Sequence, residues 1–371
     1  MVNHLGNWRN GELGNFITLK RGFDLPQQKR EDGQVPIFSS SGITGTHSTA
    51  MVNAPGVITG RYGTIGEVFY AAEDFWPLNT TLFVEDFHGN DAEFIYYFLK
   101  TLEWSKFTSA SAVPGINRNT VHKETVSLPD IETQRRIAST LSMLDEKIKT
   151  NTEINDNLYA QAKAIFDNHF INIDAIPAGW RKGNLLDIAN YLNGLAMQKF
   201  RPQGNEIGLP VLKIKELRQG SCDDSSELCS LSIKPEYIIH NGDVIFSWSG
   251  SLLVDIWCGG TCGLNQHLFK VTSDIYDKWF YYLWTAHHLA RFIAIAADKA
   301  TTMGHIKREE LAKAEVLIPC EEDYTSFNSI MQPIFELIIS NRIESRKLAA
   351  LRDELLPKLM SGEIDVSAIQ L

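Results

Sequence analysis

The sequence has 371 residues, 44% of them hydrophobic, which is long enough for two globular domains that each bury a core. No apolar run approaches the roughly 18 to 20 residues of a membrane span. The N-terminus lacks the apolar segment of a secretory signal, so we expect a cytoplasmic protein. The formal net charge is −10, with the acidic excess mostly in residues 1–130 and 320–371. Net charge alone therefore does not settle whether the chain binds nucleic acid.

Residues 1–130 are predicted to form a first module made mainly of β-strands. The runs VIT (57–59), EVFY (67–70) and TLFV (81–84) are short, β-branched or aromatic, and bounded by turn residues. Between the first two runs, Gly60, Gly63 and Gly66 read as turn glycines. A helix is predicted after Asn90, which we expect to cap it with Glu93 completing a capping box.

Residues 173–319 are predicted to form a second module that repeats the first. GVITGRYGTIGEVFY (56–70) resembles GDVIFSWSGSLLVDIW (242–257), and LNTTLFVE (78–85) resembles LNQHLFKV (264–271). SAVPGINRNTVHKETVSLP (111–129) likewise resembles TTMGHIKREELAKAEVLIP (301–319). The offset between copies grows from 172 to 190, as insertions in surface loops would produce. The matching helix of the second copy is expected over about 274–296.

A long helix is predicted after each module, within residues 131–172 and 320–371. Apolar residues recur at alternating spacings of four and three in both segments, which is typical of helices that pair. Pro333 predicts a kink or a late start, so the regular part of the second helix is placed at about 333–360. The residues expected to pair the helices, with polar positions in the middle, are Leu141, Leu144, Ile148, Asn151, Leu158, Ile165, Ile334, Ile338, Asn341, Leu348 and Leu355. Because the segments are repeats, we expect the two helices to run antiparallel.

No catalytic motif is recognised in the sequence. There is no phosphate-binding loop, no glycine-rich methyl-donor loop after a strand and no nucleophile elbow. Pro129-Asp130 with Glu132 lacks the lysine of a nuclease motif, because residue 134 is glutamine. We expect no catalytic residue in this chain.

The five cysteines all lie in the second half, and their odd number argues against a disulfide framework. Cys258 and Cys262 precede His267, but no second closely spaced ligand pair is evident. We therefore expect buried thiols and no metal site.

Loops that differ between the copies hold the residues that could contact DNA if the modules bind it, because a repeated framework changes its specificity through its loops. Base edges and phosphates favour Arg, Lys, Asn, Gln and small hydroxyl side chains. In the first module these candidates are Ser39, Ser41, Thr44, Arg61, Tyr62, Thr64, Arg118 and Asn119. In the second they are Lys213, Lys215, Arg218, Ser249, Ser251, Thr301, Thr302, His305, Lys307 and Arg308. Lys213 and Lys215 are expected on one face of a strand. For each candidate a solvated surface side chain is the alternative.

The chain resembles the specificity subunit of type I restriction–modification enzymes. The resemblance is carried by SLPDIETQRRIASTLSMLDEKI (127–148), LRDELLPKLMSGEIDV (351–366), GRYGTIGEV (60–68) and PAGWRKGNLLDIA (177–189), and it covers nearly the whole chain. It implies an α+β fold in which two pseudo-repeated, mainly β target-recognition domains are separated by two long antiparallel helices. One departure is visible, because the glutamine of SLPDIETQ (127–134) is not repeated in VLIPCEED (316–323).

The same resemblance implies a non-catalytic subunit that reads a bipartite double-stranded DNA target. Two modification subunits would supply S-adenosylmethionine and methylate adenine, and a motor–nuclease subunit with ATP and Mg would join for restriction. The chain itself would need no cofactor. Two alternatives stay open at this point: a protein-binding scaffold of duplicated modules, and an enzyme with an unrecognised site.

Overall fold

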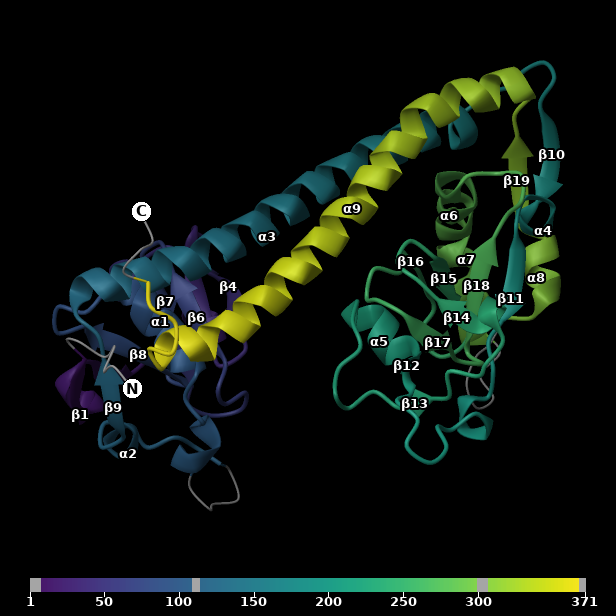
Figure 1. Cartoon of the computed structure of the whole chain (residues 1–371). Helices are drawn as coiled ribbons and strands as arrows, with labels where there is room; N and C mark the ends of the chain where they lie inside the picture. Colours follow the sequence, from purple (N-terminus) through teal and green to yellow (C-terminus); the bar gives the residue numbers. More distant parts are fainter. Residues whose placement is uncertain (1–7, 109–113, 299–305, 367–371) are drawn as a thin grey trace. The chain divides into compact units, whose positions relative to one another are not determined.

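The computed structural model describes residues 8–108, 114–298 and 306–366 (Figure 1). The chain divides into two compact units. One unit consists of residues 1–146 and 348–371, and the other of residues 147–347. Each unit holds one predicted module together with parts of both long helices.

The described residues of the first module form three small sheets and one main helix. Strands β1 (Arg9–Glu12) and β9 (Thr125–Leu128) form an antiparallel pair. The main sheet has the order β2 (Thr18–Arg21), β8 (Thr81–Asp86), β5 (Gly56–Gly60) and β6 (Val68–Ala71). The third sheet has the order β4 (Gly42–His47), β3 (Val35–Ser39) and β7 (Trp76–Pro77). Helix α1 (Ala92–Lys100) packs on the main sheet, and the short α2 (Arg118–Val121) precedes β9.

The second module repeats this topology. Strands β10 (Arg181–Asn184) and β19 (Glu315–Ile318) pair as β1 and β9 do. Its main sheet has the order β11 (Asn190–Asn193), β18 (Leu268–Thr272), β15 (Val244–Ser247) and β16 (Leu253–Ile256). The third sheet has the order β13 (Leu228–Cys229), β12 (Leu209–Leu212), β17 (Cys262–Leu264) and β14 (Ile238–Ile239). The helices are α4 (Leu185–Ile188), α5 (Ile214–Gln219), α6 (Lys278–His287), α7 (Leu289–Asp298) and α8 (Arg308–Ala312).

Strand registers confirm the predicted duplication. Arg9 faces Leu128 in the first module, and Arg181 faces Ile318 in the second, so the terminal pairs are equivalent. A parallel strand pair also recurs, as β3 with β7 in the first module and as β12 with β17 in the second. Two independent registers are therefore preserved across loops of different length, which only a repeated fold explains.

Two predicted helices differ from expectation. Asp91, not Asn90, caps α1, because its carboxylate accepts the backbone N–H of Phe94 at 2.9 Å. Asn90 is buried, and its amide donates to the carbonyl oxygens of Phe16 and Phe87. In the second module the helix expected over 274–296 is interrupted at His288, whose ring Nε2 lies 2.8 Å from the carbonyl oxygen of Glu315.

The prediction of a strand at Lys213 and Lys215 is wrong, because residues 214–219 form helix α5. Glu216 accepts a hydrogen bond from the backbone N–H of Lys213 at 3.2 Å, which caps the first turn. Gly220 ends the helix in the left-handed region at φ 75°, a conformation that glycine adopts without strain. The hydrogen bond at the start of the helix and the glycine at its end favour a helix here, although the alternation of Lys213 and Lys215 predicted a strand.

The two long helices are α3 (Ile131–Phe166), which continues into a π-helical turn at Asp167–Ile171, and α9 (Glu321–Met360). The late start predicted for the second helix is wrong, because α9 runs through Pro333. Proline cannot donate to the carbonyl of Ser329 one turn earlier. Both residues lie on the exposed side of the helix, where water can satisfy that carbonyl.

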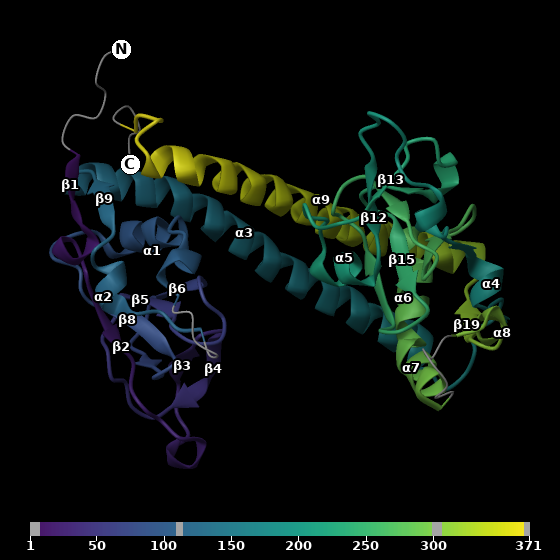
Figure 2. The ribbon, with the colours of Figure 1, turned by 90° about the horizontal axis from the view of Figure 1, so that it is seen from below.

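Helices α3 and α9 pair side by side and antiparallel (Figures 1 and 2). In the second unit Asn151 donates to Glu344 at 2.8 Å and to Ser345 at 3.2 Å, while Asn341 donates to Asn155 at 3.0 Å. Partner numbers on α9 fall as those on α3 rise, which is the antiparallel order. All the residues predicted to pair the helices are buried or half-buried.

Each unit has its own hydrophobic core, and both cores include helix residues. In the first unit Ile137 and Leu141 of α3 and Leu359 of α9 join the core between α1 and the main sheet. In the second unit Phe166 and Met331 join the corresponding core. No helix in the described part of the chain is long and apolar enough to cross a membrane.

Candidate nucleic-acid interface

Three loops of the first module that were predicted separately come together. The backbone N–H of Ile116 donates to the carbonyl of Arg61 at 3.0 Å, and Tyr62 forms an isolated bridge with Gly115. A Cβ atom on Gly63 would lie 3.1 Å from the hydroxyl of Ser40, so the β3–β4 turn lies against the loop after β5. One surface of the module therefore collects the loops around residues 40, 62 and 116.

The loops around residues 62 and 116 line a groove of about 600 Å³. Its lining combines predicted residues with two cations at the end of β2 that sequence reasoning missed. The lining residues are Lys20, Arg21, Arg61, Tyr62, Leu82, Gly115, Ile116, Asn117, Arg118 and Asn119. The sequence TLKR (18–21) contains both cations, but only the pairing of β2 with β8 places them beside Arg61.

Part of the positive charge in this groove is neutralised by the chain itself. Lys20 forms an ion pair with Glu85, and a guanidinium nitrogen of Arg21 lies 3.8 Å from a carboxylate oxygen of Asp24. Arg61 lies 4.5 Å above the ring of Tyr62 and donates to its hydroxyl at 3.2 Å. Arg118 is exposed and has no ion pair among the described residues. Arg61 and Arg118 are thus the cations best placed to meet an external anion.

A histidine beside the groove contributes no charge at neutral pH. The Nε2 atom of His122 accepts the backbone N–H of Leu19 at 2.9 Å, so this nitrogen carries no proton. Burial, and then the nearby guanidinium of Arg118, lowers the pKa of His122 below its ordinary value. The ring therefore serves as a structural acceptor.

The second module repeats the same loop arrangement with different side chains. The backbone N–H of Ile306 donates to the carbonyl of Trp248 at 3.0 Å, as Ile116 does to Arg61. A Cβ atom on Gly250 would lie 3.6 Å from Ile214, as one on Gly63 would approach Ser40. The half-buried indole of Trp248 packs on Phe269, with ring centres 5.7 Å apart.

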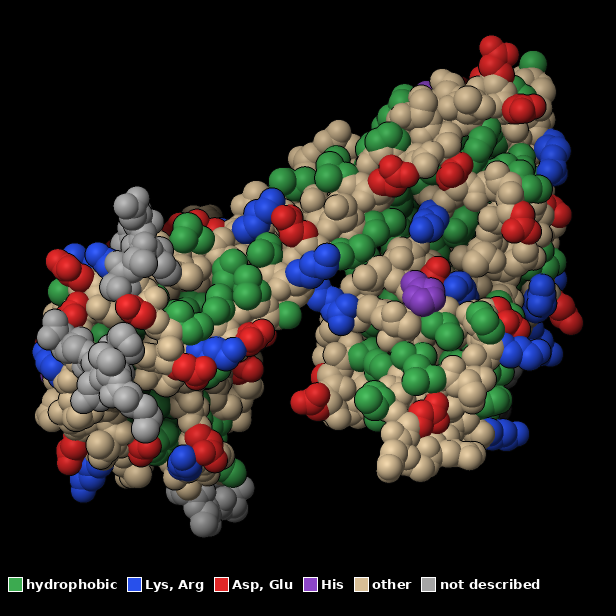
Figure 3. Space-filling model, viewed as in Figure 1, with side chains coloured by type: hydrophobic (Ala, Val, Ile, Leu, Met, Phe, Trp, Pro, Cys, Tyr) green, Lys and Arg blue, Asp and Glu red, His purple; other side chains and the backbone are tan. Residues whose placement is uncertain are grey.

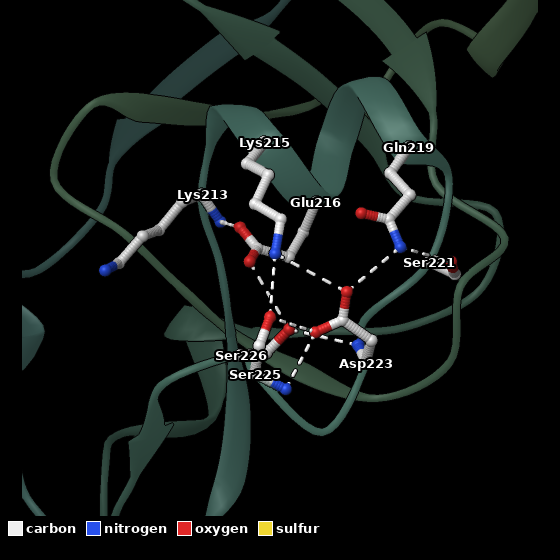
Figure 4. A network of polar contacts seen from close by, with 8 residues as sticks. All are labelled: Lys213, Lys215, Glu216, Gln219, Ser221, Asp223, Ser225 and Ser226. Atoms are coloured by element: carbon white, nitrogen blue, oxygen red, sulfur yellow. Dashed lines mark hydrogen bonds and ion pairs between the residues drawn. The ribbon is translucent and has the colours of Figure 1, made fainter. Parts of the chain in front are cut away.

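Some predicted residues of the second module are committed to partners within the chain. Ser249 is 4% exposed and its hydroxyl lies 3.0 Å from Nδ1 of His267, so we remove it from the DNA-reading set. Lys213 pairs with Glu227 at 2.5 Å. Lys215 donates to Ser225 at 2.8 Å and lies 3.4 Å from Asp223 (Figure 4). Hydrogen bonds from Ser225 lower the pKa of Asp223, so this carboxylate stays charged beside the lysine.

The other candidates are surface residues or lie outside the described part of the chain. Ser39 ends β3 and Ser41 lies in the β3–β4 turn, with their hydroxyl oxygens 3.1 Å apart. The exposed candidates are Ser41, Thr44, Thr64, Asn119, Arg218, Ser251, Lys307 and Arg308. Thr301, Thr302 and His305 fall outside the described residues. On the face seen in Figure 3, acidic and basic side chains are interspersed in both units.

The cysteines carry free thiols. Cys229, Cys258 and Cys262 are buried, and burial raises the pKa of Cys258 above its ordinary value. Within the described ranges, no group of three or more His, Cys, Asp or Glu side chains is placed to hold a metal ion.

Duplicated α+β modules, each with one loop cluster and a share of a long helix pair, define a two-module recognition protein. Residues 6–160 and 177–351 match the family described as Type I restriction modification DNA specificity domain. The chain belongs to this family. It is therefore a specificity subunit of the type I restriction–modification class, whose function is recognition of the DNA target and not catalysis.

Relatives and a solved structure agree with this assignment. The specificity subunit of the type I restriction enzyme MjaIX from Methanocaldococcus jannaschii is 27% identical over 310 residues, covering 76% of this chain and 71% of the relative. The specificity subunit of the type I restriction enzyme HindI from Haemophilus influenzae is 20% identical over 354 residues, covering 73% and 77%. The crystal structure of a type I restriction–modification S subunit from M. genitalium shares the fold, with a TM-score of 0.65 and 15% identity over 97% of each chain.

Proposed function

We propose that this chain reads a bipartite DNA target, with residues 12–128 contacting one half-site and residues 184–318 the other. The observation that carries the proposal is the repeated loop cluster. In it the backbone N–H of Ile116 donates to the carbonyl oxygen of Arg61, and that of Ile306 donates to the carbonyl oxygen of Trp248. Two copies of one surface with different side chains suit two half-sites of different sequence. In this proposal residues 1–130 and 173–319 are the recognition domains, and residues 131–172 and 320–371 are the spacers.

We further propose that two modification subunits dock on the helical regions and methylate adenine with S-adenosylmethionine. A restriction subunit would join them and use ATP and Mg. The names of the relatives, which are subunits of restriction enzymes, support a multi-subunit assembly. The repeat supports two corresponding docking positions, because each long helix follows directly after the last strand of its module, β9 or β19.

A domain exchange tests the assignment of half-sites. Residues 12–128 are replaced by the equivalent segment of a related specificity subunit, and methylated adenines are mapped by sequencing the host DNA. One half of the methylated motif should change while the other half and the gap are retained. A change in both halves would contradict the assignment of one half-site to each module.

The alternative of a protein-binding scaffold is not favoured by the family match, which is to a DNA specificity domain. Gel-shift measurements with the modification subunits present separate the two. Sequence-specific retention of duplex DNA supports reading by the modules, whereas a complex that retains no DNA favours the scaffold.

A further inference from the structure

Asn193, the last residue of β11, is an exposed amide beside the indole of Trp248. The Nε1–H group of Trp248 donates to Oδ1 of Asn193 at 3.0 Å. An indole N–H can only donate, so this contact determines which end of the amide is the oxygen. The amide of Asn193 therefore has a fixed orientation although it lies on the surface.

The indole that fixes Asn193 is itself held in place. Its ring centre lies 5.7 Å from that of Phe269 and 6.3 Å from that of His267. His267 is in turn held by the hydroxyl of the buried Ser249, 3.0 Å from its Nδ1 atom. The amide is thus positioned before any ligand arrives, which lowers the entropy lost on binding.

The contact leaves a defined hydrogen-bonding pattern on the outward side of Asn193. Within the described ranges, no other group occupies the two hydrogens of Nδ2 or the second lone pair of Oδ1. One donor beside one acceptor matches adenine in the major groove, where N7 accepts and the N6 amino group donates. Asparagine bound to both atoms is a specific contact for this base.

The equivalent position in the first module is Arg21, the last residue of β2. Arg21 faces Leu82 of β8, as Asn193 faces Phe269 of β18, so the two residues occupy the same place in the repeated sheet. Arg21 lines the basic groove with Arg61 and Arg118. An arginine at such a place favours guanine, whose O6 and N7 atoms both accept.

We propose that Asn193 reads an adenine in the half-site of the second module, with Trp248 as its positioning residue. Arg21 reads a guanine in the half-site of the first module. The inference rests on the proposed function, namely that each module reads one half-site. It adds the residues that select a base and the base that each selects.

The test uses the complex of this chain with its modification subunits. Methylation rates are measured on duplexes in which each position of both half-sites is varied in turn. Asn193→Ala should lower the preference for adenine at one position of one half-site by about 5- to 150-fold, the factor that one good bidentate contact provides. All other positions should keep their preference. Asn190→Ala, at the exposed other end of the same strand, is the matched control and should change nothing.

Two further variants give readouts that a structural role would not. Asn193→Arg should move the preference at that position from adenine towards guanine, and Arg21→Asn should do the reverse in the other half-site. Trp248→Phe keeps a ring on Phe269 but removes the donor, so it should reduce selection of the adenine while leaving binding to non-specific DNA unchanged.

The possible results distinguish a failure of the base assignment to Asn193 from a failure of the proposed function. If the wild-type complex methylates a two-part motif but Asn193→Ala retains every base preference, the inference is overturned and the proposed function stands. If the wild-type complex shows no two-part motif, the proposed function fails and the inference fails with it. Loss of selection at the single adenine position supports both.

Discussion

The first module presents the guanidinium of Arg61 where the second presents the indole of Trp248, although the carbonyl oxygen of each accepts the same backbone hydrogen bond from a downstream isoleucine. At the neighbouring strand end Arg21 of the first module corresponds to Asn193 of the second. The backbone framework is thus repeated, while the side chains on it have changed from charged to aromatic and amide groups. We therefore expect the first module to contact DNA more through charge and the second more through oriented neutral groups.

Different residues anchor the start of the main helix in the two modules. In the first module the side-chain oxygen of Gln134 accepts the backbone N–H of Asp91 at 2.9 Å, at the start of α1. In the second module the hydroxyl of Tyr324 accepts the N–H of Asp277 at 2.7 Å, at the start of α6. The glutamine missing from the second junction is therefore replaced by a tyrosine that anchors the same helix end. Gln134 is fully buried, so its role here is internal.

The largest effect is expected from a change in the two long helices, which both modules share. Four residues inserted after Asn151 and four after Asn341 would lengthen both helices by about 6 Å, at about 1.5 Å per residue. We expect the gap in the methylated motif to grow by about one to two base pairs, at about 3.4 Å per pair. Both half-sites should keep their sequence. Methylome sequencing measures this, and an unchanged gap with full activity would leave the helices as docking surfaces only.

The next largest effect is expected at an ion pair that the second module has and the first lacks. Arg342 of α9 donates to both carboxylate oxygens of Asp255, at 2.9 and 2.7 Å, whereas Phe69 occupies the equivalent place in the first module. Asp255→Ala would leave the half-buried guanidinium of Arg342 without its carboxylate partner. The free energy of unfolding should fall by about 2 to 4 kcal/mol.

Chemical denaturation of the full chain measures this loss, and Asp274→Ala, at an exposed aspartate of the same unit, serves as the control. Replacing both partners by Asp255→Leu and Arg342→Met should recover much of the stability, because no unpaired charge remains. Equal losses in the control and the test variant would show that the ion pair has no special role.

Acidification should affect the second module through His288. Burial lowers the pKa of this histidine below its ordinary value of 6.5. The unfolded chain therefore binds a proton before the folded chain does, and stability is complete above pH 6.5 and declines as the pH falls below it. For one proton the decline cannot exceed about 1.4 kcal/mol per pH unit, and it ends once the histidine of the folded chain is itself protonated.

His288→Gln should flatten this pH dependence, measured by denaturation between pH 8 and 5. His122→Gln tests the corresponding contribution of the first module, where His122 is less buried and its pKa is lowered in the same direction. An unchanged pH dependence in both variants would assign the decline to other groups.

The smallest expected effect distinguishes free cations from paired ones. Arg61→Ala and Arg118→Ala should each reduce the salt dependence of DNA binding by about one unit of slope, because each removes one phosphate contact. Lys307→Ala and Arg308→Ala should behave likewise. Lys213→Ala and Lys215→Ala should change it less, because Glu227 and Asp223 already pair with these lysines. Equal slopes for all six variants and the wild type would indicate that these residues are solvated surface side chains that do not contact DNA.

Much of the fold follows from periodicities that are local in sequence. The repeat, the strand runs and the two helical segments with polar positions near Asn151 and Asn341 were all predicted, since spacing of apolar residues reports which face is buried. The expectations that failed concerned the ends of elements and one short segment, expected as a strand, that forms helix α5. The capping by Asp91 and the helix at residues 214–219 depend on hydrogen bonds that several candidate residues compete to make.

The sequence by itself determined the duplication, the α+β class, the absence of a recognised catalytic motif and the three loops of each module from which readers were proposed. Tertiary structure decided which residues of those loops remain available. Strand pairing brings Lys20 and Arg21 beside Arg61, and it buries Ser249 against His267. It also orients Asn193 through Trp248, a contact between residues 55 positions apart. Composition and spacing report local preference, whereas availability for a ligand depends on neighbours that only the folded chain supplies.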